Sequence, residues 1–184
     1  MNHLLFLMAD GFEEMEFVAP LDILRRGEVK VTLASIHENT RVEGGHGLVI
    51  ETDVLLSEAD VHSFQGVLIP GGGQGVRNLQ KSEAALDAIR HFYQEKKWVT
   101  AICAAPLLLV PAGIAQYHKL TSYPGVEKEL APYAKHYSED RVVVDGKLIT
   151  SRAAGTAEEF ALKILECLEG KEKAEEVRAQ ILGR

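Results

Sequence analysis

The chain has 184 residues, of which 46% are hydrophobic and 26% are charged, the balance of a globular protein that buries a core without disulfides or structural metal. Its formal net charge is -7 and it has no block of basic residues, which argues against nucleic acid and anionic membrane surfaces as partners. No apolar run approaches the ~18 residues of a membrane span, and the first residues do not resemble a secretion signal, so we expect a cytoplasmic protein.

Short apolar segments alternate with amphipathic ones along the chain. Apolar runs predict strands over residues 4–8, 29–34, 66–70, 98–102 and 120–122. Apolar residues at helical spacing predict helices over residues 13–26, 82–96, 104–115, 156–169 and 173–182. Glycines and turn residues predict hairpins over residues 41–50 and 142–151.

This alternation predicts a single α/β domain over residues 1–184, with a mostly parallel sheet and helices on both faces. No internal repeat, low-complexity stretch or linker divides the chain. In such folds the functional residues gather at the carboxyl ends of the strands, so we expect the site there.

Cys103 lies on the turn between the strand over residues 98–102 and the helix expected after it. Small residues after the cysteine, and Pro106 in the first helical turn, are typical of a nucleophile elbow. Backbone amides and the positive helix end would favour the reactive thiolate, and an amide there could also stabilise an oxyanion. Alternatively, Cys103 is a small buried hydrophobic residue, the interpretation we adopt for Cys167.

Three glutamates open the first helix. Complementation of the helix dipole explains Glu13 and Glu14, whereas Glu16 lies one turn in and can point back over the sheet edge. Near a thiolate its carboxyl would be pushed towards the protonated form, which could donate a hydrogen bond or shuttle a proton. The glycines after Pro70 are not followed by the lysine of a phosphate loop. They form either a plain sharp turn or a turn whose backbone amide points at the same oxyanion.

The chain offers no pattern for a metal or cofactor site. Its seven histidines are scattered, without the i,i+4 or clustered spacing of metal ligands. We therefore assign neither a metal nor a cofactor.

Four segments together resemble the ThiJ/PfpI superfamily: ADGFEEME at residues 9–16, LIPGG at 68–72, AICAAP at 101–106 and TSRAAGT at 150–156. The resemblance runs nearly end to end. It implies a flavodoxin-like three-layer sandwich that usually forms a homodimer. It also implies that Cys103 is the nucleophile, that Glu16 is the acid hydrogen-bonded to it, and that the amides of Gly72 and Ala104 form an oxyanion hole.

The sequence departs from this superfamily at three positions. Tyr123 stands where some members have a histidine before a proline, which removes the obvious imidazole base. Ala104 stands where the protease-like branch has histidine, so peptidase activity is not expected. His46 corresponds to an arginine that approaches the site from the partner subunit. We hypothesise that His46 of the partner subunit replaces the missing base in part, and that Tyr123 donates a hydrogen bond.

The resemblance implies several activities: glutathione-independent glyoxalase, protein deglycase, peroxide sensor and chaperone. We expect a cysteine-dependent stress-response protein that acts on small reactive aldehydes, as a glyoxalase- or deglycase-type hydro-lyase or hydrolase. The alternative is a redox sensor or chaperone in which an oxidant converts Cys103 to the sulfinate, with little or no turnover.

Overall fold

The computed structural model describes residues 2–183, and its centre is a seven-stranded sheet with the order β10-β11-β7-β6-β1-β2-β5. All neighbouring strands are parallel except the antiparallel pair β10 and β11. The sheet strands are β1 (His3–Met8), β2 (Lys30–Ser35), β5 (Val54–Leu55), β6 (Gly66–Ile69), β7 (Trp98–Ile102), β10 (Val142–Asp145) and β11 (Leu148–Ser151). Two small sheets pair β3 (Arg41–Glu43) with β4 (Val49–Glu51), and β8 (Lys119–Leu120) with β9 (His136–Tyr137).

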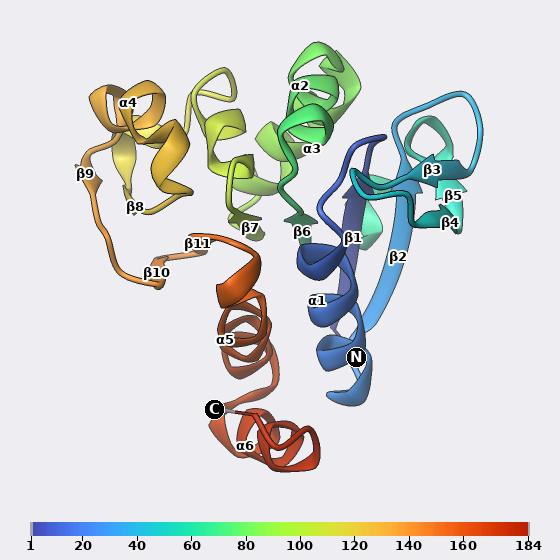
Figure 1. Cartoon of the computed structure of the whole chain (residues 1–184), viewed down its shortest axis with the longest axis vertical. Coiled ribbons are helices and arrows are strands. Elements are labelled where there is room, and N and C mark those ends of the chain that lie inside the picture. The colour runs from blue at the N-terminus through green and yellow to red at the C-terminus, as the bar shows by residue number, and fades with distance from the viewer. Residues whose placement is uncertain (1, 184) are drawn as a thin grey trace.

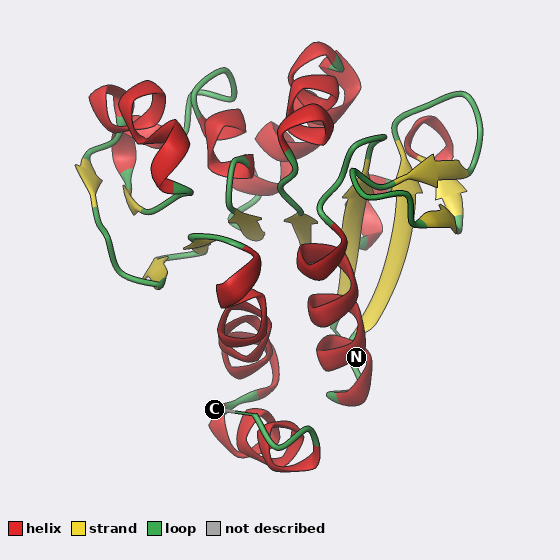
Figure 2. Ribbon diagram, viewed as in Figure 1, coloured by secondary structure: helices red, strands yellow, loops and turns green. Residues whose placement is uncertain are grey.

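Helices cover both faces of the large sheet (Figure 1). The α-helices are α1 (Glu14–Arg26), α2 (Gly73–Lys81), α3 (Glu83–Gln94), α4 (Glu127–Leu130), α5 (Ala157–Glu169) and α6 (Lys171–Gln180). Helices α1 and α5 lie side by side on one face, with α6 against the outer side of α5, and α2 and α3 lie on the other face (Figure 2). This arrangement confirms the three-layer α/β fold.

Strand β1 explains why both faces must be covered, because its side chains alternate between two cores. Phe6 and Met8 point into the core under α1 and α5, whereas Leu5 and Leu7 point into the core under α2 and α3. All four are completely buried. Burying one such side chain contributes about 1.5–3 kcal/mol, so the continuous apolar run holds both layers.

The structure corrects the expected helix over residues 104–115. Only a short 3-10 turn, Ala105–Leu109, follows β7. Pro111 explains the difference, because proline lacks the N–H that an α-helix needs at that position and its ring clashes with the preceding turn. The helix dipole expected beside Cys103 is therefore much weaker than that of a long α-helix.

Further differences concern short elements. Helix α2 begins directly after Gly72, where we expected only a turn. The strand expected over residues 120–122 is β8, which pairs with β9 outside the large sheet. The hairpins expected over residues 41–50 and 142–151 are confirmed as β3–β4 and β10–β11. None of the described helices is both long and apolar enough to cross a bilayer.

Candidate active site

The candidate site lies where the direction of strand addition reverses, at the carboxyl ends of β1 and β6. Strand β2 lies on one side of β1 and β6 on the other, and such a switch point leaves an open crevice between the following loops. Glu16 comes from the helix after β1, Gly71 and Gly72 from the loop after β6, and Cys103 from the turn after β7. Three separate segments thus meet at one edge of the sheet.

Cys103 has a strained backbone, with φ of 64° in the left-handed region that non-glycine residues rarely adopt. Two backbone hydrogen bonds hold it there: its N–H donates to the carbonyl of Ser151 at 3.0 Å, and its carbonyl accepts from the N–H of Tyr123 at 2.8 Å. The side chain is half-buried. This is the geometry of a nucleophile elbow, which turns the sulfur out of the strand at the carboxyl end of the sheet.

Glu16 is fully buried although it is acidic. Its Oε2 atom accepts a hydrogen bond from the N–H of Gly71 at 2.8 Å, and its own N–H donates to Oε2 of Glu13, the N-cap of α1. Burial raises the pKa of Glu16 to about 7; the negative charge of Glu13 acts in the same direction, while Cys103 and the Gly71 amide partly oppose it. At neutral pH this carboxyl is therefore divided between its two protonation states.

The electrostatics of Cys103 differ from the expectation that local amides make it a thiolate. The N–H groups of Ala104 and Gly72 do donate to the sulfur and lower its pKa. Burial, followed by the charge and hydrogen bonding of Glu16, outweighs them and raises the pKa of the thiol. Cys103 therefore favours the thiol over the thiolate in the free protein.

Glycine is required at two positions of the loop after β6. At Gly71, a Cβ atom would overlap Oε2 of Glu16 and lie 2.6 Å from the Cβ of Cys103. Gly72 has φ of 93°, and a Cβ there would overlap the carbonyl oxygen of Gly11. The missing side chains thus let the backbone pass between the acid and the thiol.

Tyr123 and His46 have exposed side chains, unlike the buried or half-buried residues around Cys103. The backbone N–H of Tyr123 donates a hydrogen bond to the carbonyl of Cys103. Its ring is about half exposed, and its hydroxyl makes no hydrogen bond to the described residues. His46 has a side chain that is 79% exposed; its Nδ1 lies 2.8 Å from Oε2 of Glu14, and its N–H donates to Oε1 of the same residue. The hydrogen bond to Glu14 raises the pKa of His46, so within one chain it is paired with Glu14.

One group near the site has the composition of metal ligands. Glu13, Glu14 and His46 each place one ligand atom within 4.8 Å of the others. These atoms already have partners, because Glu13 caps the N–H of Glu16 and Glu14 bonds His46. We therefore assign this cluster to the anchoring of the β3–β4 arm on the start of α1.

Sequence reasoning missed two contributors to the site. Gly71 supplies the amide that binds Glu16, and Ser151 supplies the carbonyl that holds Cys103. Both lie inside segments that carried the superfamily resemblance, so the signal was present. Its physical meaning depends on contacts between distant segments, which no local pattern encodes.

The fold and the site define a class: α/β sandwich proteins with a cysteine on a strained elbow and a buried acid facing it. Comparison with protein families matches residues 2–167 to the DJ-1/PfpI family. The chain belongs to the DJ-1/PfpI family.

Individual relatives agree with this assignment. The chain is 40% identical to the dj-1beta protein of Drosophila melanogaster over 97% of this chain and 95% of that protein. The alignment with the crystal structure of DJ-1beta from the same organism covers 100% of this chain and 98% of that one, with 39% identity and a TM-score of 0.95. The alignment with the structure of an oxidized DJ-1 from Toxoplasma gondii covers 100% of this chain and 99% of that one, with 32% identity and a TM-score of 0.93. A deglycase from Pyrococcus horikoshii is 31% identical over 80% of this chain and 88% of its own length.

Proposed function

We propose that the protein converts a small reactive oxoaldehyde into a hydroxy acid at Cys103, without glutathione. The observation that carries this proposal is Glu16, a buried carboxyl with a pKa of about 7 that faces the thiol. A general acid–base works best when its pKa lies near the working pH, because it then both accepts and returns a proton readily. Glu16 could thus supply the proton transfers for which related proteins use a histidine at the position of Tyr123.

The proposed reaction needs no external oxidant. The Cys103 sulfur bonds to the aldehyde carbon while the thiol proton passes to the carbonyl oxygen, which gives a hemithioacetal. Glu16 removes the proton from that carbon and returns it to the neighbouring ketone carbon, while the hydroxyl proton of the first carbon passes to the ketone oxygen. The first carbon is thereby oxidised to a thioester and the second reduced to an alcohol. Water then adds to the resulting thioester, the carbon–sulfur bond breaks, the sulfur regains its proton, and the hydroxy acid leaves. For methylglyoxal the sum is one aldehyde and one water to one lactate.

The amides of Gly72 and Ala104 support the same proposal. In the free protein both donate towards the sulfur. In the reaction they would stabilise negative charge on the sulfur and on the adjacent oxygen, an effect of about 2.7–4 kcal/mol per donor where it has been measured. The deglycase from Pyrococcus horikoshii among the relatives is consistent with aldehyde-derived substrates.

Methylglyoxal turnover to lactate in glutathione-free buffer tests this proposal. We expect turnover in the wild type, none in Cys103→Ser, and wild-type turnover in Cys167→Ser, because Cys167 lies on α5 away from the strand ends. Lactate formation that persists in Cys103→Ser would refute the covalent mechanism. Absence of lactate in every variant would refute the enzyme proposal altogether.

The second candidate is a redox sensor at the same cysteine, and one of the comparisons favours it: the Toxoplasma gondii structure is of an oxidized DJ-1. One peroxide would transfer an oxygen to the Cys103 thiolate with release of hydroxide, and a second would convert the sulfenic acid to the sulfinic acid with release of water. The amides around the sulfur would then bind the new oxygens. Mass spectrometry after mild peroxide distinguishes this candidate, since Cys103 but not Cys167 should gain two oxygen atoms.

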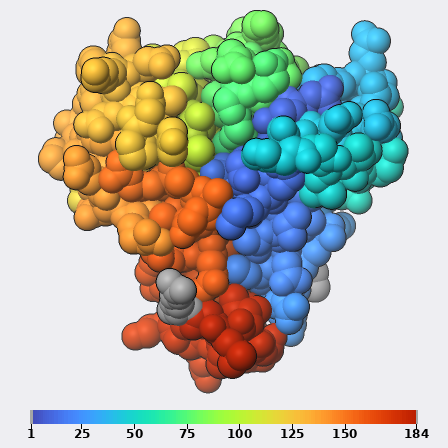
Figure 3. Space-filling view, viewed as in Figure 1, coloured from blue at the N-terminus to red at the C-terminus, as the bar shows by residue number. Residues whose placement is uncertain are grey.

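We further propose that the protein is a homodimer formed through α1 and the β3–β4 arm. The arm lies directly against the α1 region (Figure 3), and these neighbouring segments expose the apolar side chains of Met15, Val18, Leu48 and Val49. Burying such a patch against its copy removes apolar surface from water. In sedimentation equilibrium we expect Val49→Asp to shift the protein towards monomer, and Val144→Asp, equally exposed on β10, to leave it dimeric. A monomeric wild type would contradict this proposal.

A further inference from the structure

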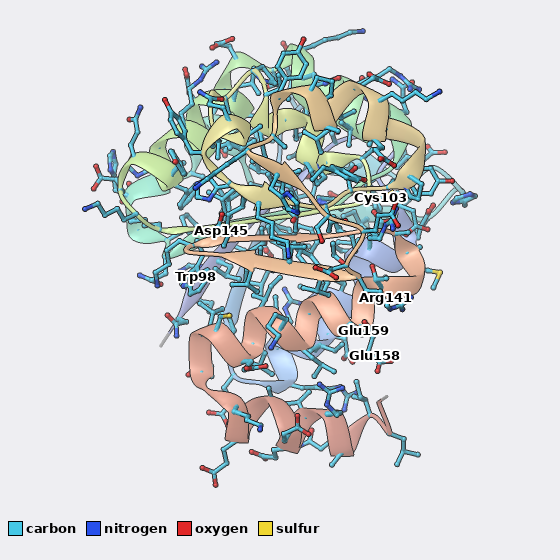
Figure 4. All side chains as sticks on the ribbon, turned by 90° about the vertical axis from the view of Figure 1, so that its left-hand side faces the viewer. Trp98, Cys103, Arg141, Asp145, Glu158 and Glu159 are labelled. Carbon is cyan, nitrogen blue, oxygen red and sulfur yellow. The ribbon has the colours of Figure 1, made fainter. Side chains whose placement is uncertain are left out.

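A pocket lies at the end of the sheet opposite Cys103. Figure 4 shows Trp98 and Asp145 at one end of the sheet and Cys103 at the other. The pocket has a volume of about 450 Å³ and lies between the end of α3, the start of β7 and the β10–β11 turn, lined by Tyr93, Gln94, Lys96, Lys97, His118, Lys147 and Leu148. This volume is within the ~300–1,000 Å³ of small-molecule sites.

Three lysines surround this pocket and give it a local positive charge. Lys96, Lys97 and Lys147 line both it and an adjoining hollow of about 240 Å³ that reaches Trp98. Over residues 2–183, no carboxylate forms an ion pair with any of the three; Lys97 donates to the carbonyl of His62 at 2.8 Å, and the Lys147 ammonium lies 4.0 Å from the centre of the Trp98 ring. In a chain with a net charge of -7, this cluster creates a site that attracts anions.

The wall of the pocket is apolar and aromatic, with a fixed polar chain inside it. Leu148 is buried, and the rings of Tyr93 and His118 meet edge to face at 5.5 Å. Nδ1 of His118 lies 3.3 Å from the Asp145 carboxylate, and Nε2 lies 3.1 Å from the Tyr93 hydroxyl. Nε2 of His118 and the Tyr93 hydroxyl thus form a hydrogen-bonded pair, whereas Nδ1 of His118 makes no hydrogen bond to the described residues.

We propose that this pocket binds a small organic anion that has a flat apolar body and a phosphate or carboxylate head. The head would lie among Lys96, Lys97 and Lys147, where it gains three ammonium groups that lack acidic partners. The body would lie on Tyr93 and Leu148. The Asp145 carboxylate also faces this region, but the N–H of Lys119 already donates to it at 2.8 Å. This site is separate from the cysteine chemistry and does not depend on it.

Phenyl phosphate is the probe for this site, and Trp98 is the reporter, because it is the only tryptophan in the chain. An anion that draws Lys147 away from the indole ring should change the tryptophan emission in a saturable way. Calorimetry on the same samples gives the affinity independently of the reporter. We expect inorganic phosphate, which has the head without the body, to bind at least ~10-fold more weakly, since burying a phenyl ring contributes more than 1.4 kcal/mol.

The variant Lys96→Asn/Lys147→Gln tests the contacts. Asparagine suits position 96 because Lys96 has φ of 55°, a region that asparagine tolerates. We expect at least ~10-fold weaker binding of phenyl phosphate by calorimetry. The control Lys128→Gln/Lys171→Gln removes the same charge from exposed positions on α4 and α6, and should bind like the wild type. Cys103→Ser should also bind normally.

Four results would overturn the proposal. These are a titration that does not saturate, an equal loss of affinity in the Lys128→Gln/Lys171→Gln control, inorganic phosphate that binds as tightly as phenyl phosphate, and a loss of binding in Cys103→Ser. Equal loss in the Lys128→Gln/Lys171→Gln control would show that only net charge matters. Equal binding of inorganic phosphate would show that the site does not bind the apolar body. Loss of binding in Cys103→Ser would place the binding at the cysteine.

Discussion

Replacing Glu16 with glutamine is expected to lower aldehyde turnover by about 10²–10⁴-fold, the usual contribution of a positioned general acid–base. Glutamine has nearly the same shape, and its carbonyl oxygen can still accept the hydrogen bond from the Gly71 amide. Only the ionisable proton is lost. In the wild type the turnover should change with an inflection near pH 7, the pKa of the buried carboxyl, and this inflection should disappear in the variant.

The same substitution should increase stability at alkaline pH. Burial raises the pKa of Glu16 from 4.5 to about 7, so the folded state holds a proton that the unfolded state releases between these values. The stability that this protonation contributes is fully present below pH 4.5 and is lost as the pH rises through 7. The shift corresponds to about 3 kcal/mol, which Glu16→Gln would recover at pH 8 but not at pH 4.

Urea unfolding at the two pH values measures the stability change, and Asp22→Asn is the matched control. Asp22 lies on the same helix in an exposed ion pair with Arg26, so its replacement should change stability by less than ~1 kcal/mol at either pH. If Glu16→Gln keeps wild-type turnover and the inflection near pH 7, another group carries the proton. If its stability follows that of the wild type at both pH values, the carboxyl does not have a raised pKa.

Replacing Gly71 with alanine is expected to lower turnover by about 10²-fold, because the added methyl group would push apart the two groups that must act together. The new Cβ would overlap the Glu16 carboxyl and approach the Cβ of Cys103 to 2.6 Å. Neither neighbour can move away freely, since Glu16 is buried and Cys103 is held by hydrogen bonds to Ser151 and Tyr123. Overpacking of this kind also costs about 1–3 kcal/mol of stability.

Gly73→Ala, two residues further on at the start of α2, is the control. A Cβ at Gly73 meets only the end of the Arg77 side chain, at 3.4 Å, and that flexible group can shift. Its stability should stay within ~0.5 kcal/mol of the wild type, with unchanged turnover. Turnover of methylglyoxal and reaction of the Cys103 thiol with an alkylating reagent measure both variants. Equal turnover in Gly71→Ala and Gly73→Ala would show that the spacing of acid and thiol is not critical.

Much of the framework was predictable because it depends on local patterns. The apolar run at the start of the chain required burial on both faces, and the alternation of strands and helices required a mostly parallel sheet. The position of Cys103 between a strand and a proline-containing turn predicted the elbow. The α-helix expected after the elbow was wrong for a reason that is also local. Apolar spacing alone predicts a helix up to residue 115, but Pro111 cannot be accommodated in its interior.

The chemistry of the site was decided by the tertiary structure. Glu16 acquires its raised pKa because folding buries its carboxyl, and the thiol of Cys103 and the amide of Gly71, 55 residues away, only partly oppose the shift. His46 is predicted to approach the cysteine of the partner subunit, and within its own chain it is paired with Glu14. Residue patterns report which side chains are buried, whereas a pKa depends on the charges and dipoles that folding brings from distant segments. The sequence by itself therefore determined the sheet and the cysteine's place on it, and the tertiary structure decided which groups surround that cysteine.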